Sequence, residues 1–310
     1  MDEGAILIAG VGGIGCIWAE KAHSKCPELS DLLLIDADEE SFAGAATAHC
    51  LHLDAGGDGR GTASLTALAA HRIRDGNSSI SQLMEKAELV IILAGLGGGM
   101  GSGAAAELAS LAMESDSLVI SIVGLPFAEQ PLRYSIAEAS LPEIQANSNL
   151  CIRVSMERLA WQARYRGTDW RTGSGWIEEL VEGLVTTLAR VGKINLDLMD
   201  LRAIVSKSGG STLLVAEGHC DEAQELYERA RSSPLAALSV GGATGCLLQV
   251  EGGPHMTLKQ VEAVANAFTD GLSIDAQVII GARVSPDLAE RMRVVAVVSG
   301  LPRGSSEGLV

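Results

Sequence analysis

Short, solidly apolar segments recur along the first half of the chain and are separated by glycine-rich or polar turns. They are residues 5–9, 32–35, 89–93 and 118–123. Runs of this length are typical of strands covered on both faces, as in a parallel sheet between layers of helices. Helical patterns alternate with them up to about Leu159. We therefore predict an α/β fold with a doubly wound parallel sheet, whose loops gather at the carboxyl ends of the strands.

A second α/β pattern follows the first, and 310 residues exceed what one hydrophobic core usually spans. Strands are predicted at 211–216, 245–250, 277–282 and 294–298, with helices at 221–230 and 258–272. An amphipathic segment, 176–191, is long enough for a helix that joins the two halves. We expect a nucleotide-binding domain at 1–172, a linking core helix at 173–192, a smaller C-terminal α/β domain at 193–302 and a short disordered tail at 303–310.

Charge and composition exclude several classes of partner. The net charge of −16 and the lack of a Lys/Arg run argue against nucleic acid, and no apolar run is long enough for direct membrane insertion. The six cysteines are scattered without a C-x-x-C pair, so we interpret them as reduced core residues and predict no metal held by the protein itself. The first strand begins almost at the N-terminus, without the pattern of a signal or transit peptide. A cytoplasmic protein is expected.

The first apolar segment runs into the glycine turn G-V-G-G-I-G, which precedes a helical pattern. Its glycines are Gly10, Gly12, Gly13 and Gly15. Backbone amides and a helix N-terminus at such a turn are suited to phosphate. Asp36 ends the next strand at the distance where a dinucleotide-binding domain has its ribose-binding acid. This turn alone leaves open a dinucleotide-dependent oxidoreductase, an adenylating enzyme of the ubiquitin-activating type, or a tight turn without ligand.

A second glycine turn narrows these alternatives. It lies between the apolar segment 89–93 and a helical pattern at 104–113, and consists of Gly97, Gly98, Gly99, Met100, Gly101, Ser102 and Gly103. Because almost no side chain obstructs it, several successive amides can surround a polyphosphate. A hydride-transferring enzyme has no use for this second turn. Two glycine turns at neighbouring strand ends, without a P-loop lysine, predict a triphosphate held from two sides.

The second turn resembles the G-G-G-x-[GS]-[ST]-G signature of the tubulin/FtsZ family, and the resemblance extends in order over roughly residues 5–301. It implies bound GTP or GDP, with Mg²⁺ held mainly through phosphates and water, and head-to-tail self-assembly into cytoskeletal filaments. Glu129 and Arg133 follow Pro126-Phe127 and resemble the family's contacts to ribose and base; a surface ion pair is the plainer alternative. Residues 57–61 are similar in position to the loop that senses the terminal phosphate, and 232–235 and 241–253 resemble the C-terminal domain.

The segment that follows the predicted linking helix carries the candidate catalytic residues. It includes Asn195, Asp197 and Asp200, with the two carboxylates three residues apart. It resembles the family's synergy loop, which implies that it acts on the nucleotide of the adjacent subunit and polarises the attacking water. Taken from the residues alone, Asn195 or Asp197 is equally typical of a helix N-cap.

Several positions depart from the family's pattern. Met100 stands where a threonine is usual, and Ile17, Met156 and Gly175 replace the usual guanine contacts, so the choice of base is not determined by these side chains. These departures favour an alternative, a nucleotide-free or non-hydrolysing scaffold or modulator of a paralogue. The chain stops at Val310 without the usual peptide extension. We therefore expect partners to be further copies of itself or a family paralogue, without a tail-mediated adaptor.

Overall fold

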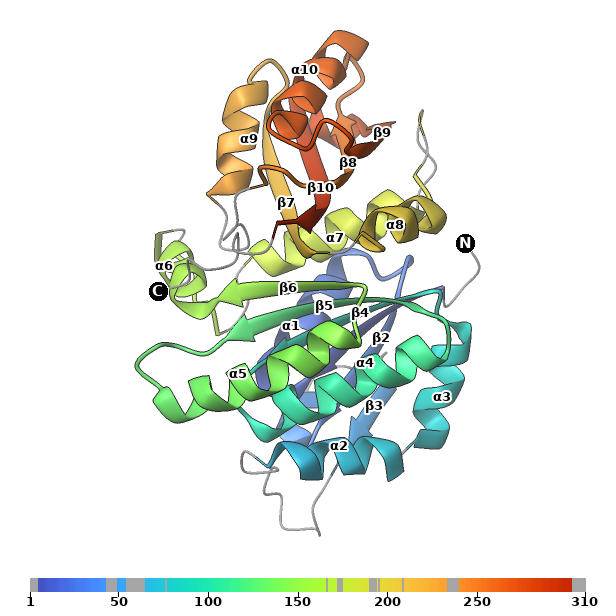
Figure 1. Cartoon of the computed structure of the whole chain (residues 1–310), viewed down its shortest axis with the longest axis vertical. Helices are drawn as coiled ribbons and strands as arrows, with labels where there is room; N and C mark the ends of the chain where they lie inside the picture. Colours follow the sequence, from blue (N-terminus) through green and yellow to red (C-terminus); the bar gives the residue numbers. More distant parts are fainter. Residues whose placement is uncertain are drawn as a thin grey trace. The chain divides into compact units, whose positions relative to one another are not determined.

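The computed structural model describes residues 5–42, 49–53, 65–75, 77–165, 167–171, 175–189, 194, 196–207, 209–232 and 240–302. The chain divides into two compact units, Met1–Val185 and Thr186–Val310, each built around its own sheet (Figure 1). The division falls inside helix α7 (Trp176–Ala189), which lies within the predicted linking segment. The predicted tail, 303–310, lies outside the described residues.

The first unit contains a six-stranded sheet in the order β3-β2-β1-β4-β5-β6. Its strands are β1 (Ile6–Val11), β2 (Asp31–Asp36), β3 (His49–His52), β4 (Leu89–Gly95), β5 (Leu118–Leu125) and β6 (Leu150–Ser155). Every neighbouring pair is parallel, so the predicted doubly wound parallel sheet is confirmed. The four central strands are the predicted apolar runs, because these are the strands that both layers of helices cover.

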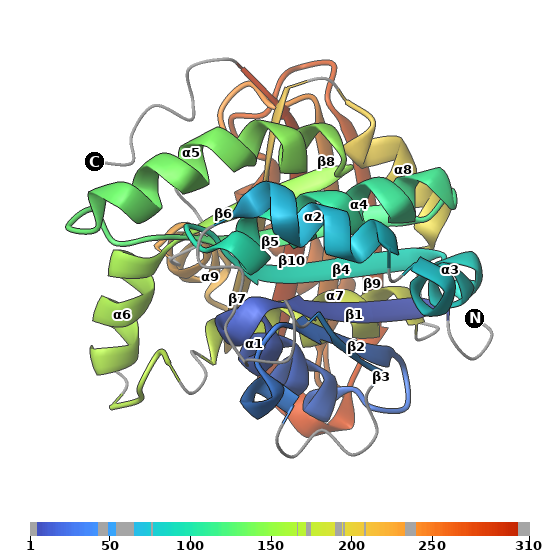
Figure 2. The same cartoon turned by 90° about the horizontal axis from the view of Figure 1, so that it is seen from below.

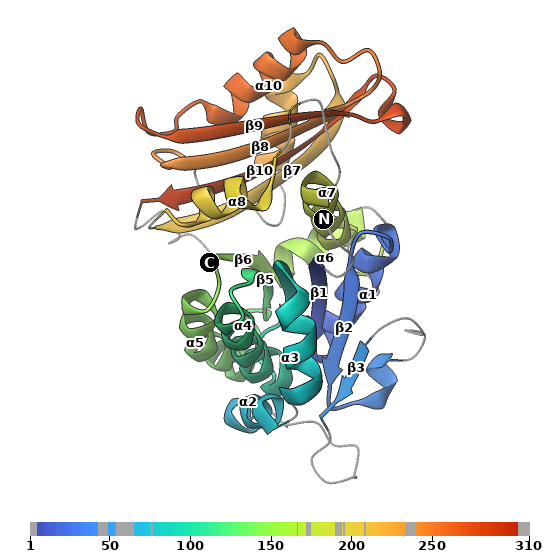
Figure 3. The ribbon, with the colours of Figure 1, turned by 90° about the vertical axis from the view of Figure 1, so that its right-hand side faces the viewer.

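Helices cover both faces of this sheet. They are α1 (Gly12–Lys25), α2 (Thr66–Asp75), α3 (Asn77–Lys86), α4 (Ala105–Glu114), α5 (Pro131–Ala146) and α6 (Met156–Tyr165), with the short helix η1 (Glu39–Phe42) and the π-helical turn η2 (Met100–Ala104). Figures 2 and 3 show α1 on one face and α2 to α5 on the other. A continuous apolar core of aliphatic side chains fills the layer between the sheet and α2 to α5.

The second unit contains a four-stranded mixed sheet in the order β7-β10-β8-β9. Its elements are α8 (Leu198–Val205), β7 (Gly210–His219), α9 (Ala223–Arg231), β8 (Gly245–Gly252), α10 (Leu258–Thr269), β9 (Gln277–Val284), the short helix η3 (Pro286–Leu288) and β10 (Arg291–Leu301). Strand β10 is antiparallel to β7 and β8, whereas β8 and β9 are parallel. Helices α9 and α10 cover one face, around Phe268, and α8 lies against the other (Figure 3). The predicted second, smaller α/β domain is confirmed.

In the part of the chain that the structure describes, no helix combines the length and apolar character needed to cross a membrane. The six cysteines form no disulfide. The interpretation of all of them as core residues is wrong for Cys50, which is exposed on the edge strand β3, and Cys151 and Cys220 are only half-buried. An edge strand has a neighbouring strand on one side only and is less completely covered, so its side chains are not all buried.

Candidate nucleotide site

The first glycine turn joins β1 to α1 in the first unit. Strand β1 ends at Val11, and α1 begins at Gly12, which has a φ of +74° that favours glycine. The N-cap residue Val11 provides no side-chain acceptor for the first amides of the helix. Those N–H groups and the positive end of the helix dipole are therefore available to an anion.

The second glycine turn follows β4 and is held by an internal hydrogen bond. Gly97 has a φ of +94°, and its N–H donates to Ser102 Oγ over 2.9 Å. Ser102 is fully buried, and its own N–H donates to the carbonyl of Gly98 over 3.1 Å. The chain then enters the π-helical turn η2 ahead of α4, so the helical region begins earlier than the predicted residue 104. Turns of this type are often found at functional sites.

The two glycine turns, far apart in sequence, meet in the structure. A Cβ atom built on Gly12 would lie 3.2 Å from the amide nitrogen of Gly101. Gly13 is exposed and Gly98 is half-buried, and a Cβ built on Gly98 would meet no atom within 4 Å. The parallel pairing of β1 with β4 produces this meeting, because it brings the carboxyl ends of both strands to one edge of the sheet.

Helix α5 borders the second glycine turn. A Cβ built on Gly97 would lie 2.7 Å from the Cβ of Arg133 and 2.8 Å from its carbonyl oxygen. Arg133 is in the first turn of α5, and Glu129 lies in the loop before it; both side chains are exposed. The structure shows no ion pair between these two residues, which was the plainer alternative for this spacing. It therefore brings Arg133 to the glycine turns but records no contact of Glu129 with them.

Glu157 makes hydrogen bonds near the site that the sequence analysis did not predict. Its carboxylate accepts hydrogen bonds from the amide of Ala128 and, over 3.2 Å, from the hydroxyl of Ser155. It thereby connects the start of α6 to the loop before α5. Glu157 follows Met156, which stands where a guanine contact is usual, and an acidic residue at the start of a helix is the sequence signal that could have indicated this connection.

Aromatic side chains strengthen the same region. Phe127 packs edge-on against Trp170, with ring centroids 5.3 Å apart, and the guanidinium of Arg171 lies 4.7 Å from the centroid of the Trp170 ring. Such aromatic and cation–π contacts order a loop at low entropic cost. The proline-phenylalanine loop before α5 is therefore supported from two sides, by Glu157 and by Trp170.

Asp36, which the dinucleotide alternative assigned to ribose, lies beside the first glycine turn. A Cβ built on Gly13 would be 3.8 Å from Asp36 Oδ2. The carboxylate is buried and accepts hydrogen bonds from Ser41 Oγ at 2.6 Å and from the Ala37 amide at 2.7 Å. Burial raises the pKa of Asp36, and these two hydrogen bonds oppose that rise without cancelling it.

The residues that depart from the family's pattern are mostly part of the core. Met100 is buried in the apolar core of the first unit, with 7% of its surface exposed. Met156 is also buried, and its sulfur would lie 3.0 Å from a Cβ on Gly124, which also faces the ring of Trp18. Ile17 is half-buried on α1. The space above Gly98 is therefore not filled by Met100.

In the second unit, the two candidate catalytic carboxylates cap α8. Asp197 is the N-cap residue, and its Oδ1 accepts from the Asp200 amide over 2.9 Å. Asp200 Oδ2 accepts in return from the Asp197 amide over 3.1 Å, which completes a capping box. The helix-cap role that the residues alone suggested is therefore present for Asp197, and the bonds use one oxygen of each carboxylate. Asn195 and residues 57–61 lie outside the described residues.

Comparison with known proteins accounts for both units. A family model described as "Tubulin/FtsZ family, GTPase domain" matches residues 5–162, and one described as "FtsZ family, C-terminal domain" matches residues 209–302. The chain is 30% identical over 306 residues to cell division protein FtsZ 1 of Archaeoglobus fulgidus, covering 96% of this chain and 82% of that protein. It is also 30% identical over 309 residues to cell division protein FtsZ 2 of Haloferax volcanii, with 96% and 75% covered.

Solved structures show the same fold. An FtsZ dimer from M. jannaschii superposes with a TM-score of 0.82 at 23% identity, covering 96% of this chain and 89% of that one. CetZ2 from Haloferax volcanii, solved as a GTPγS-bound protofilament, superposes with a TM-score of 0.78 at 21% identity, with 96% and 93% covered. The order of the glycine turns, the fold of both units and the match across nearly the whole chain agree. This chain belongs to the tubulin/FtsZ family, and its first unit carries that family's GTPase domain.

Proposed function

We propose that this chain binds GTP at the two glycine turns and assembles head-to-tail with further copies of itself. In this proposal, the loop containing Asp197 and Asp200 in one copy acts on the GTP bound by the next. The observation that carries the proposal is the meeting of the two turns, in which a Cβ on Gly12 would contact Gly101 while the space at Gly98 stays open. Amides from both turns are then available to one polyphosphate.

The remaining contacts of the nucleotide would come from the loop before α5 and from α5 itself. Arg133 borders Gly97, so its guanidinium is within reach of a ligand that lies on the glycine turns. Glu129 is exposed one turn earlier and is suited to accept from ribose hydroxyls. Glu157 and Trp170 would keep the intervening loop in place through the contacts described above.

The residues at this site fit a Mg²⁺ ion that is held through the nucleotide rather than by a protein cage. The carboxylate nearest the first turn is that of Asp36, and both of its oxygens already accept hydrogen bonds. Mg²⁺ usually keeps several waters and binds through substrate phosphates. The ion would supply charge neutralisation on the phosphates when bound.

In this proposal hydrolysis depends on the neighbouring copy, whose second unit carries Asp197 and Asp200. Each carboxylate uses one oxygen in the capping box of α8, and the other oxygen can orient a water toward the terminal phosphate. Phosphoryl transfer needs little covalent assistance, so positioning and charge account for most of the rate. We assign Asn195 a supporting role in the same loop. The relative described as a GTPγS-bound protofilament supports assembly as part of the proposal.

A second candidate function is a non-hydrolysing scaffold or a modulator of a paralogue. Two observations favour it. Met100 contributes a core side chain where the family usually has a hydroxyl, and Asp197 and Asp200 are accounted for by their role as a helix cap. In either case the relatives named as cell division proteins suggest a cytoskeletal role in the cytoplasm, where cysteines without disulfides are expected.

The decisive experiment measures bound nucleotide and phosphate release. Nucleotide is extracted from the purified protein and identified, and phosphate release is followed with GTP and with ATP over a range of protein concentrations. A rate per subunit that rises with protein concentration, for GTP above ATP, is expected from a site shared between copies. Bound GTP or GDP without turnover would support the scaffold instead. A rate per subunit that does not depend on concentration would contradict the shared site.

Gly98→Ala tests the nucleotide position itself. The added Cβ meets no protein atom within 4 Å, so the fold should be unaffected, whereas a bound polyphosphate would be crowded. We expect GTP affinity to fall about tenfold in a fluorescent-nucleotide titration, roughly 1.4 kcal/mol. Gly210→Ala in β7 is the control, because its Cβ would make only an ordinary contact with Leu301. Unchanged affinity in Gly98→Ala would place the nucleotide elsewhere.

A further inference from the structure

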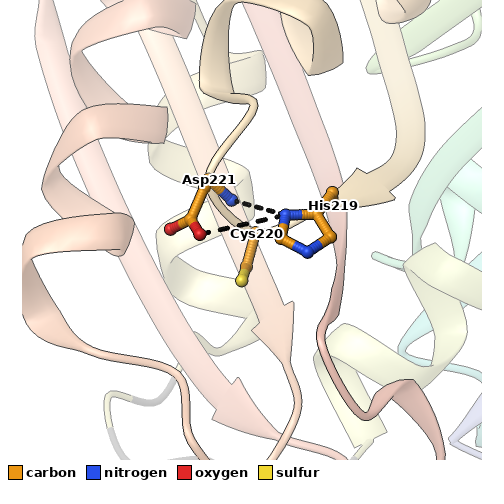
Figure 4. Close-up of side chains that lie close together, drawn as sticks. All are labelled: His219, Cys220 and Asp221. Atoms are coloured by element: carbon orange, nitrogen blue, oxygen red, sulfur yellow. Dashed lines mark hydrogen bonds and ion pairs between the residues drawn. The ribbon is translucent and has the colours of Figure 1, made fainter.

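Three consecutive side chains of the second unit gather at the end of β7. Strand β7 ends at His219, and the chain turns there, with the amide of Glu222 donating to the His219 carbonyl over 3.2 Å. The turn brings a ring nitrogen of His219, the Cys220 sulfur and a carboxylate oxygen of Asp221 within 4.8 Å of one another (Figure 4). Imidazole, thiolate and carboxylate are the three side-chain types that bind zinc-like cations.

We propose that His219, Cys220 and Asp221 form a binding site for a thiophilic divalent cation, with Zn²⁺ as its representative. A tetrahedral zinc ion with bonds of about 2.0 to 2.3 Å holds its ligand atoms roughly 3.3 to 3.8 Å apart. The three side chains would therefore have to close by about 1 Å. The side chains of His219 and Asp221 are 45% and 69% exposed, which leaves space for this movement.

Nearby groups are arranged as outer contacts of such a site. The Gln260 side-chain amide lies 3.1 Å from the Cys220 sulfur and 2.8 Å from Asp221 Oδ1, and it donates to both. The Cys220 sulfur and Asp221 Oδ1 are therefore held on the same side by one neutral donor. Gln260 Oε1 accepts from the Thr257 amide over 2.9 Å in the capping box of α10, which fixes the orientation of the side chain.

Glu290 completes the arrangement on the other side of the imidazole. Its Oε2 lies 3.9 Å from His219 Nε2, whereas Asp221 Oδ2 lies 4.0 Å from His219 Nδ1. His219 Nδ1 also accepts a hydrogen bond from the Asp221 amide over 3.3 Å, which a bound cation would replace (Figure 4). A carboxylate at the second ring nitrogen is the usual way in which a protein orients a histidine that binds metal. The pairing of β7 with β10 brings Glu290 there, because Arg291 is in register with His219 and the Cys220 amide donates to the Glu290 carbonyl.

The local charge also favours a cation. Among the described residues, the ion pairs that the structure shows for Asp221 and Glu290 are both with His219. The nearby arginines Arg291 and Arg293 pair with Glu217 instead. Two carboxylates thus face one imidazole beside the Cys220 thiol, and a divalent cation would offset the repulsion between these carboxylates and the thiolate that forms when it binds. No metal held by the protein itself was predicted from the sequence, and the proposed site differs from that prediction. The sequence did not indicate the site because the pattern H-C-D lacks the spacing of known zinc motifs.

Cobalt binding tests the proposal in the full-length protein after treatment with a chelator. Co²⁺ bound by Cys220 should produce a thiolate-to-cobalt charge-transfer absorption, which Zn²⁺ then abolishes by competition. Cys220→Ser should remove this absorption, while Cys50→Ser, which replaces the exposed thiol of the other unit, should retain it. His219→Ala should weaken Co²⁺ binding at least about tenfold. Circular dichroism verifies that each variant is folded.

A gain-of-function variant separates a metal site from a hydrogen-bonded turn. Gln260→Glu keeps an acceptor for the capping box of α10 but brings a carboxylate oxygen toward Cys220 and Asp221. We expect it to bind Zn²⁺ about tenfold more tightly. Absence of the cobalt absorption, or its survival in Cys220→Ser, would overturn the proposal. None of these measurements involves nucleotide, so their outcome is independent of the proposed GTPase activity.

Discussion

Asp36 is a buried carboxylate beside the first glycine turn, and its protonation affects the stability of the fold. Only 7% of its surface is exposed, and its oxygens accept from Ser41 and Ala37. Because burial raises the pKa of Asp36 in the folded state, the folded protein binds a proton at this carboxylate more tightly than the unfolded chain does. Stability should therefore fall as pH rises from the ordinary aspartate pKa through the raised value, and the full penalty is present above that raised value.

Asp36→Asn removes that penalty while keeping an oxygen for the Ala37 amide and an NH₂ group for Ser41. We expect a higher Tm than that of the unmodified protein at pH values above the raised pKa, and a difference that shrinks as the pH is lowered through the raised value to the ordinary aspartate pKa. Thermal unfolding followed by circular dichroism over this pH range measures it. The exposed Asp275 of the second unit provides the control variant, Asp275→Asn. An equal Tm difference at every pH would contradict the assignment.

At the same scale, the glycine residues were predictable and their neighbours were not. The turns around Gly12 and Gly97 could be identified because glycine is required wherever φ is positive or backbones approach closely. The contact of Glu157 with the amide of Ala128 could not, because it joins the start of α6 to the loop before α5, which only the parallel pairing of β5 and β6 brings together. The burial of Met100 was likewise decided by packing, since methionine suits both core and surface positions.

Among the elements, α8 carries a structural and a proposed catalytic role on the same two side chains. The capping box between Asp197 and Asp200 satisfies two amides that a helix start otherwise leaves unpaired. A loss of activity on removing either side chain is therefore ambiguous, because a frayed helix would have the same effect. A variant that removes the negative charge but keeps the oxygen that accepts the capping hydrogen bond resolves this ambiguity.

Asp200→Asn keeps an oxygen for the Asp197 amide and removes the negative charge, so stability should change by less than about 0.5 kcal/mol. We expect GTP turnover to fall by about 10²-fold or more, with nucleotide binding retained. The matched control is Thr257→Ala, which breaks the capping box of α10 and should cost about 1 kcal/mol of stability without changing turnover. Normal turnover in Asp200→Asn would show that the carboxylate serves only as a cap.

The edge strand β3 and the turn η2 after the central strand β4 were elements that sequence patterns predicted poorly. Strand β3 is short and polar, and its side chains are exposed or half-buried, so it lacks the apolar run that identified β1, β2, β4 and β5. The π-helical turn η2 moved the start of the following helix because Gly101, Ser102 and Gly103 adopt helical hydrogen bonding when packed. Both differences arise from tertiary contacts that override weak local preference.

For the whole molecule, the proposed sharing of a site between copies can be tested by mixing inactive variants. Gly98→Asp places a negative charge where the polyphosphate would bind but leaves the Asp197–Asp200 loop intact. Asp200→Asn has the opposite defect. We expect each variant to be inactive alone and the mixture to recover GTP turnover. In the mixture, the intact loop of Gly98→Asp can face the nucleotide bound at the intact site of Asp200→Asn. Sedimentation establishes that mixed filaments form, and mixed filaments without turnover would contradict the shared site.

The α/β class, the strands of the two sheets other than the edge strands of the first, and both glycine turns could be predicted from the amino-acid sequence alone, because apolar periodicity and glycine content are local properties of the chain. The meeting of Gly12 with Gly101 was decided only by the tertiary structure, through the parallel pairing of β1 and β4. The contacts of Cys220 with Gln260 and of His219 with Glu290 were decided in the same way. Such contacts depend on which distant strands and helices are neighbours, and no local pattern in the chain specifies that choice.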